Sequence, residues 1–146
     1  MTENLARPEE CNCFAVRSAA RHVSQYYDRY LAATGLRTTQ FSILAKLKRL
    51  GRLTINELAR QMVMDRTTLG RNVKPLERDG LIRIEPAQSD GRARELRLSK
   101  TGEKQLEAAF EAWSRAQAGF DRTFGQRRAA ELRRVLRDVV ATELRP

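Results

Sequence analysis

The sequence predicts a mainly α-helical fold with one small antiparallel β-hairpin, and two observations support this prediction. Apolar residues recur every three or four positions over most of the 146 residues, which is typical of amphipathic helices. Strict alternation of apolar and polar residues is confined to two short runs, 82–85 and 95–98, with Gly91 in the turn between them. The length suits one domain, or two closely packed subdomains.

The first fifty residues predict an arm and two helices. Residues 1–10 are expected to form the arm, although Pro8-Glu9-Glu10 would also suit a first helical turn. A helix from Cys13 to Ala33 should end through a left-handed glycine at Gly35. The next helix begins after Thr38 or Thr39 and runs to Gly51. It has few polar positions inside, so we expect it to be the buried centre of the fold.

Residues 54–99 predict a helix, a tight turn, a second helix and the hairpin. Thr54 and Glu57 have the spacing of a capping box. After a turn at Val63-Met64, the Asp65 carboxylate can accept the free amide hydrogens at the start of the second helix. A very short strand is expected at Arg52-Leu53.

The helix after Asp65 has two contrasting faces. One face should pack against a core; its residues are Leu69, Val73 and Leu76. The opposite face carries a short polar residue followed by cations; these are Thr67, Arg71, Lys74 and Arg78. Such a face suits the major groove of DNA, so this helix is interpreted as a DNA-recognition helix. Pro75 lies within it and predicts either a kink or an early end.

The net charge of +10 indicates a polyanionic partner, with nucleic acid as the first candidate and a membrane surface as the second. No apolar run approaches the roughly 18 residues of a membrane-spanning helix. The start MTENLARPEE lacks the pattern of a signal peptide, so a cytoplasmic location is expected. The two cysteines, Cys11 and Cys13, are too close in sequence for an ordinary structural disulfide.

Ser99 can cap a long helix that follows the hairpin, and a last helix is expected from about Gln126. The apolar residues expected on the first are Leu106, Phe110, Trp113, Phe120 and Phe124, and those on the second are Leu132, Val135, Leu136, Val139 and Val140. These helices are longer and more apolar than a DNA-binding unit of about 45 residues needs for its own core. The terminal helices therefore predict a partner surface, and a second copy of the chain is the simplest one.

With these elements in place, the chain resembles the MarR (multiple antibiotic resistance regulator) family of transcriptional regulators. The resemblance runs from about Cys13 to Leu144, and its most specific segments are TINELARQMVMDRTTLGRNVKPLERDGLI, SDGRARELRLS and KTGEKQ. It implies a winged helix-turn-helix DNA-binding lobe plus a helical dimerisation region, with the hairpin as the wing. The implied divisions are an arm and dimerisation helix at 1–35, the DNA-binding lobe at 36–100, and dimerisation helices at 101–146.

By this resemblance, Thr67, Thr68, Arg71 and Asn72 lie where the family contacts base edges, and Arg92 lies where its wing arginine enters the minor groove. Arginine and asparagine can each make paired hydrogen bonds to a base. Lys74, Arg78 and Arg94 are expected to contact phosphates, which orient a protein without reading sequence. A homodimer should bind a pseudo-palindromic operator in double-stranded DNA, with half-sites about 10 base pairs apart.

The resemblance also implies a repressor released by a small aromatic or phenolic ligand. The candidate ligand contacts are Arg17, Arg21, His22, Tyr26 and Trp113. The alternative is that Trp113 belongs to the core and the arginines are simply solvated.

Cys13 suggests a different signal, because the Cys13-Phe14 start of a helix and Tyr27 resemble the branch of the family that senses organic hydroperoxides. Arg17 and Thr38 stand where that branch has two further tyrosines. A thiol at a helix start with arginines nearby would oxidise readily. Cys11 could resolve the oxidised sulfur only after a backbone rearrangement.

Other classes of function fit less well. His22 is the one histidine, so an enzyme using a histidine triad, or a structural zinc site, is not expected. No cofactor motif such as a phosphate-binding glycine loop is found. A nonspecific architectural DNA-binding protein remains an alternative, because net charge alone would serve it.

Overall fold

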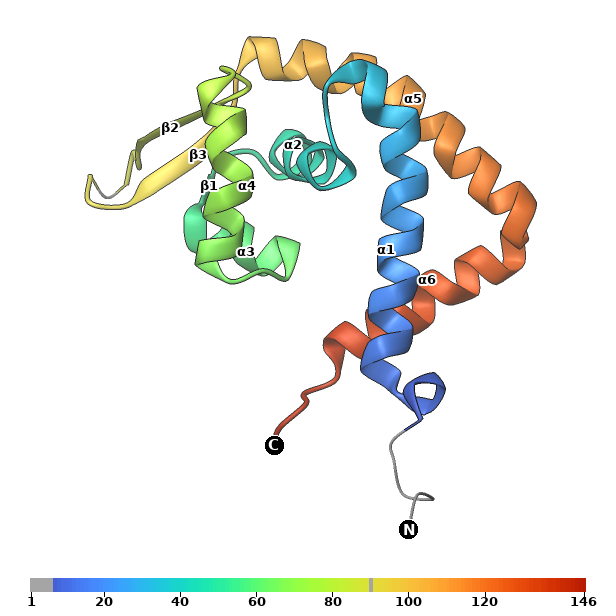
Figure 1. The fold of residues 1–146 in the computed structure, drawn as a ribbon. Helices are drawn as coiled ribbons and strands as arrows, with labels where there is room; N and C mark the ends of the chain where they lie inside the picture. Colours follow the sequence, from blue (N-terminus) through green and yellow to red (C-terminus); the bar gives the residue numbers. More distant parts are fainter. Residues whose placement is uncertain (1–6, 90) are drawn as a thin grey trace.

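The computed structural model describes residues 7–89 and 91–146, and its helices and strands are shown in Figure 1. A lobe formed by α2, α3, α4 and three short strands lies to one side of α1, and α5 extends from this lobe across α1 (Figure 1). In chain order the elements are the 3₁₀ turn Pro8–Glu10, α1 Asn12–Leu31, the 3₁₀ turn Ala32–Thr34, α2 Thr38–Leu50, β1 Leu53–Thr54, α3 Ile55–Met62, α4 Arg66–Arg78, β2 Ile82–Pro86, β3 Arg94–Leu98, α5 Lys100–Phe124 and α6 Gln126–Ala141.

The helix ends follow the predicted signals closely. Gly35 adopts the left-handed conformation, with φ of 77°, just after the turn that ends α1. Thr54 and Glu57 form the predicted capping box, in which the Glu57 carboxylate accepts from Thr54 N at 2.9 Å. The start of α2 differs by one residue, because Thr38 already belongs to the helix and its amide donates to the Asp28 carboxylate of α1 at 2.7 Å.

The core of the lobe surrounds α2. Phe41, Ile43, Leu44 and Leu47 are buried, as expected for a central helix, whereas Leu50 at its end is exposed. The strands form one antiparallel sheet in the order β1-β3-β2. The hairpin of β2 and β3 was predicted; its pairing with β1 was not, because two residues give no readable alternation.

Helix α5 packs through small residues rather than through its aromatic ones. Its buried positions are Gly102, Leu106, Ala109, Ala112, Ala116 and Gly119. At Gly119 a Cβ atom would overlap the hydroxyl of Tyr26, so glycine allows α1 to approach closely. Phe110, one of the predicted apolar residues, is 56% exposed, because the adjacent alanine stripe faces the core.

Ser99 and Gly102 join the lobe to α5. The Ser99 hydroxyl donates to the carbonyl of Gly80 at 2.6 Å and accepts from the amide of Gly102 at 2.9 Å. The amide of Ser99 donates to the carbonyl of Leu81 at 3.1 Å. A Cβ atom at Gly102 would overlap that same carbonyl oxygen, so the start of α5 lies directly against the backbone that follows α4. Among the described residues, none of the helices is long and apolar enough to span a membrane.

Gly102→Ala should lower the free energy of unfolding by at least about 2 kcal/mol, because the new methyl group overlaps backbone that cannot move aside easily. Urea unfolding followed by circular dichroism measures the change. Gly70→Ala in α4 is the matched control, since its Cβ would meet nothing within 4 Å. There the substitution should stabilise the helix by up to about 1 kcal/mol. Equal effects at the two positions would contradict the close approach at Gly102.

Candidate nucleic-acid interface

The start of α4 is held by a strong cap. The Asp65 carboxylate accepts from the Thr68 amide at 2.7 Å and from the Thr68 hydroxyl at 3.0 Å. These hydrogen bonds, with Arg71 nearby, lower the pKa of Asp65. In the preceding turn Val63 adopts the left-handed conformation with φ of 53°, which is rare for a β-branched residue. The turn and cap together set the direction in which α4 leaves α3.

The two predicted faces of α4 are present. Leu69, Val73 and Leu76 are buried in the core of the lobe. The opposite face is exposed and consists of Thr67, Arg71, Lys74 and Arg78. Thr67, Arg71 and Lys74 come together at a hollow of about 390 Å³ between α4 and Ile84 of β2.

Two predicted base-reading side chains are engaged within α4. The Thr68 hydroxyl is committed to the Asp65 cap, and the Asn72 side-chain amide donates to the carbonyl of Thr68 at 2.9 Å. Asn72 is also half-buried. Reading a base through Asn72 would therefore require its amide to exchange an intrahelical hydrogen bond for one to DNA.

Pro75 does not end α4, which continues to Arg78. The prediction of an early end is therefore wrong. Pro75 is half-buried between the buried Val73 and Leu76, and the Asp79 amide donates to the Pro75 carbonyl at 3.0 Å, which completes the last turn of the helix. Tertiary packing of Val73 and Leu76 on either side offsets the lost hydrogen bond.

The hairpin is braced at its base by an ion-pair network. Arg97 of β3 donates two hydrogen bonds, of 2.9 and 3.0 Å, to the Glu85 carboxylate of β2. These bonds, with the charge of Arg52 3.6 Å away, lower the pKa of Glu85. Arg94 begins β3 opposite Pro86, the residue after Glu85, so the network lies close to Arg94 in the sheet. Arg92 and Arg94 line a second hollow, which Arg66 of α4 also lines.

A capped helix with an exposed basic face, set against its preceding helix and flanked by a basic hairpin, defines the class of winged helix-turn-helix DNA-binding proteins. The comparisons with known proteins agree. The model of the MarR family matches residues 36–93. The transcriptional regulator MosR of M. tuberculosis in complex with DNA is 35% identical, with 92% of this chain and 100% of MosR covered and a TM-score of 0.78.

Two further relatives are reduced AbfR bound to DNA and the transcriptional activatory protein BadR of Rhodopseudomonas palustris. AbfR is 29% identical, with 88% of this chain and 92% of AbfR covered and a TM-score of 0.67. BadR is 28% identical over 109 residues, so the match covers 73% of this chain and 62% of BadR. The chain belongs to the MarR family of DNA-binding transcriptional regulators.

The structure does not bring the five candidate ligand contacts together. Arg17, Arg21 and His22 are exposed along α1. The hydroxyl of Tyr26 donates to the carbonyl of Ala116 at 3.1 Å, and Trp113 is stacked between two phenylalanine rings, Phe41 and Phe110.

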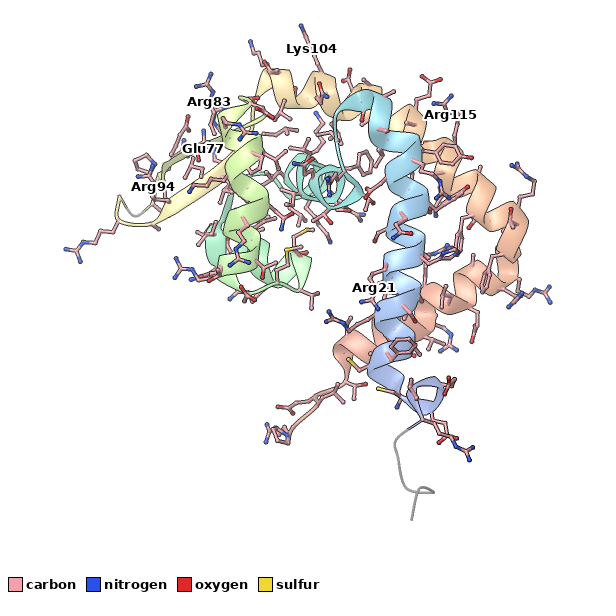
Figure 2. All side chains as sticks on the ribbon, viewed as in Figure 1. Arg21, Glu77, Arg83, Arg94, Lys104 and Arg115 are labelled. Atoms are coloured by element: carbon pink, nitrogen blue, oxygen red, sulfur yellow. The ribbon has the colours of Figure 1, made fainter. Side chains whose placement is uncertain are left out.

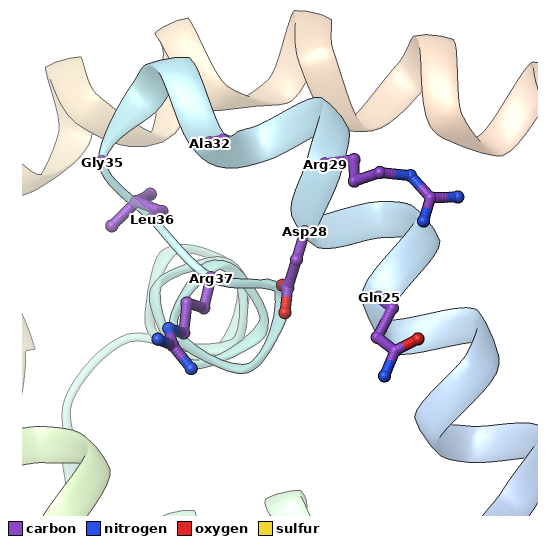
Figure 3. A pocket seen from close by; sticks show the side chains of 7 residues that line it. All are labelled: Gln25, Asp28, Arg29, Ala32, Gly35, Leu36 and Arg37. Atoms are coloured by element: carbon purple, nitrogen blue, oxygen red, sulfur yellow. The ribbon is translucent and has the colours of Figure 1, made fainter.

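A hollow of about 570 Å³ lies nearby, where α1 meets α2. Figure 3 shows Asp28 between Arg37 on one side and Arg29 on the other. Gln25 also lines this hollow. Arg21, one of the predicted contacts, precedes Gln25 by one helical turn on the side of α1 toward the lobe (Figure 2).

The cysteines lie at the start of α1. The helix begins at Asn12, one residue earlier than predicted, so Cys11 is its capping residue and its Sγ accepts from Phe14 N at 3.4 Å. Cys11 and Cys13 are both free and exposed. Among residues 7–89 and 91–146, no three histidine, cysteine or acidic side chains are grouped as a metal site would require.

Proposed function

We propose that this chain is a homodimeric, sequence-specific transcriptional repressor that binds a pseudo-palindromic operator. The observation that carries the proposal is the exposed face of α4, formed by Thr67, Arg71, Lys74 and Arg78, directly opposite the buried face of the same helix. Because the buried face anchors α4 rigidly, the basic face can enter a major groove as a unit. The wing arginine Arg92 would then reach into the flanking minor groove, and Arg94 would contact the phosphates beside it.

Arg71→Ala should remove about 1–3 kcal/mol of discrimination at one base pair in each half-site, because a bidentate contact to guanine is lost. Lys74→Ala should instead weaken binding to all sequences and flatten the dependence of log K on log salt by about 0.9 per bound lobe. Selection from random duplex DNA, followed by titration at several salt concentrations, measures both effects. Lys104→Ala, an exposed cation on α5 (Figure 2), is the control. If Arg71→Ala selected the same sequences as the parent, the assigned reading face would be wrong.

A second copy of the chain is the proposed partner of the terminal helices. Large apolar side chains are exposed at the start of α1 and along α6; they are Phe14, Val16, Val135, Leu136, Val139 and Val140. On α6 they follow the spacing of a single helix face. A continuous exposed apolar face of this kind is typical of an obligate interface.

Val139→Asp should convert the dimer to monomers in sedimentation velocity, because the interface would bury an unpaired carboxylate. The same variant should weaken operator binding strongly, since two linked half-sites are lost. Ala130→Asp is the control: Ala130 is exposed on α6, half a turn around the helix from Val139. A monomeric parent protein would contradict the proposed dimer.

Release by a small aromatic or phenolic ligand is the proposed signal, and regulators of this family are typically ligand-responsive repressors. The hollow between α1 and α2 suits this role, because Asp28, which lines it, also accepts from the first amide of α2 at 2.7 Å. A carboxylate near Arg29 and Arg37 would be attracted to both arginines and repelled by Asp28. Such a ligand would bias the angle between α1 and the lobe, and with it the spacing of the two reading helices.

Peroxide sensing through Cys13 is the second candidate, and it is favoured by the exposure of both cysteines at the positive end of α1. The Cys13 thiolate would attack a hydroperoxide, forming a sulfenic acid and releasing the alcohol. Condensation with the Cys11 thiol would give a disulfide and water. A bond between these sulfurs requires the first turn of α1 to rearrange, which would remove the Cys11 cap beside Phe14.

The two signals are separated by measuring release from a duplex selected by the parent protein. A ligand-responsive repressor should be released by aromatic acids such as benzoate or 4-hydroxybenzoate, equally in the parent and in Cys13→Ser. A thiol sensor should be released by cumene hydroperoxide in the parent but not in Cys13→Ser, and a reductant should restore binding. Peroxide release that persists in Cys13→Ser would exclude the second candidate.

A further inference from the structure

Helix α6 is attached to its own chain by few contacts. It turns back sharply from the end of α5 at a single residue, Gly125 (Figure 1). Of the sixteen described residues of α6, Ala129 alone is buried. The guanidinium carbon of Arg128 lies 4.1 Å from the centre of the Phe124 ring, but this contact spans only the joint itself. The angle between α5 and α6 therefore depends on whatever connects the two helices farther from Gly125.

One ion pair makes that connection. Nη1 of Arg133 on α6 lies 3.8 Å from Oδ1 of Asp121 on α5, and among the ion pairs of the described residues it is the one that joins these two helices. A quarter of the Asp121 side chain is exposed, yet within the described part of the chain its Oδ1 atom is buried without a hydrogen-bond partner. A buried carboxylate oxygen is costly unless a positive charge compensates it. Moving α6 away from α5 would remove that compensation.

Helix α1 belongs to the same cluster through Tyr27. Its hydroxyl donates to the side-chain oxygen of Gln117, which precedes Asp121 by one turn of α5. Burial raises the pKa of Tyr27, the charge of Asp121 raises it further, and the charge of Arg133 lowers it. The three side chains therefore lie within reach of one another's charges, and the cluster ties α6 to both α1 and α5.

The length of α5 turns this joint into a lever. The first turn of α5 is bonded to the lobe through Ser99, and α6 carries much of the proposed dimer interface. Helix α5 has 25 residues and is therefore about 37 Å long. A rotation of about 5° at Gly125 would move its far end by about 3 Å, close to the rise of one base pair. We propose that the pair of Asp121 and Arg133 fixes the spacing of the two lobes, and with it the separation of half-sites that the dimer accepts.

This inference rests on the proposed dimer and adds a determinant of specificity to it. Asp121 and Arg133 lie outside the DNA-binding lobe, so they are positioning residues that act through the angle between two helices. Buried ionic groups can favour one arrangement of a protein over others without adding to its stability. The pair should therefore govern the separation of the half-sites and leave the base sequence within each half-site unchanged.

Asp121→Asn keeps the shape of the side chain and removes its charge, and Arg133→Gln removes the opposite charge. The probes are duplexes with two half-sites selected by the parent protein, at the selected separation or with one or two base pairs inserted or deleted. The parent should bind the selected separation about tenfold more tightly than its neighbours, and each variant should lower this ratio to about threefold or less. Arg134→Gln is the matched control, because the carboxylates paired with Arg134 lie on α6 itself. It should leave the ratio unchanged.

The double variant should lower the ratio no further than either single variant, because the two residues act through each other. All variants should remain dimers in sedimentation velocity and should select the same half-site sequence as the parent. If both single variants keep the ratio of the parent, or if they dissociate to monomers, the inference is wrong while the reading face of Arg71 stands. If the parent protein selects no paired half-sites from random DNA, the proposed function itself fails.

Discussion

The buried hydroxyl of Ser99 joins the two halves of this molecule. Among the described residues Ser99 is the one buried polar residue, and its hydroxyl bonds both to the backbone after α4 and to the first turn of α5. Gly102 allows that turn to lie against the carbonyl of Leu81. The lobe therefore cannot rotate about α5 without breaking buried hydrogen bonds, which is costly. A movement of the first turn of α5 would therefore carry the lobe and α4 with it as a rigid body.

Helix α4 depends on this anchoring because it has two separate tasks. One face is completely enclosed by the lobe, while the other leaves threonine and three cations exposed. Its own sequence is not favourable for a helix, since Gly70 and Pro75 both lower helix stability. Capping by Asp65 and burial of Leu69, Val73 and Leu76 offset that cost. The reading face is consequently held by interactions made elsewhere on the same helix.

The second connection between the two halves, at Asp28, is of a different kind. It is a single carboxylate from α1 on the first amide of α2, beside a hollow that solvent can enter. A partly exposed, charge-assisted hydrogen bond is easier to perturb than the buried network at Ser99. The lobe is thus firmly attached to α5 and more weakly attached to α1. This asymmetry suits the proposed mechanism, in which a ligand changes the spacing of two DNA-binding lobes.

The sequence alone determined the order of the helices, the cap residues Thr54, Asp65 and Ser99, and the two faces of α4, because each of these is set by residues within one or two helical turns. Its family resemblance, which the comparisons confirm, followed from the same local motifs. Tertiary structure decided the contacts between distant segments. Alanines rather than Phe110 face the core on α5, and packing allows Pro75 to remain inside α4. Asp28 of α1 accepts from the first amide of α2, and Arg66 of α4 lines a hollow together with arginines of the hairpin. Periodicity assigns a residue to a face of its own element. Which neighbour covers that face depends on packing between segments far apart in the chain, and no local spacing encodes it.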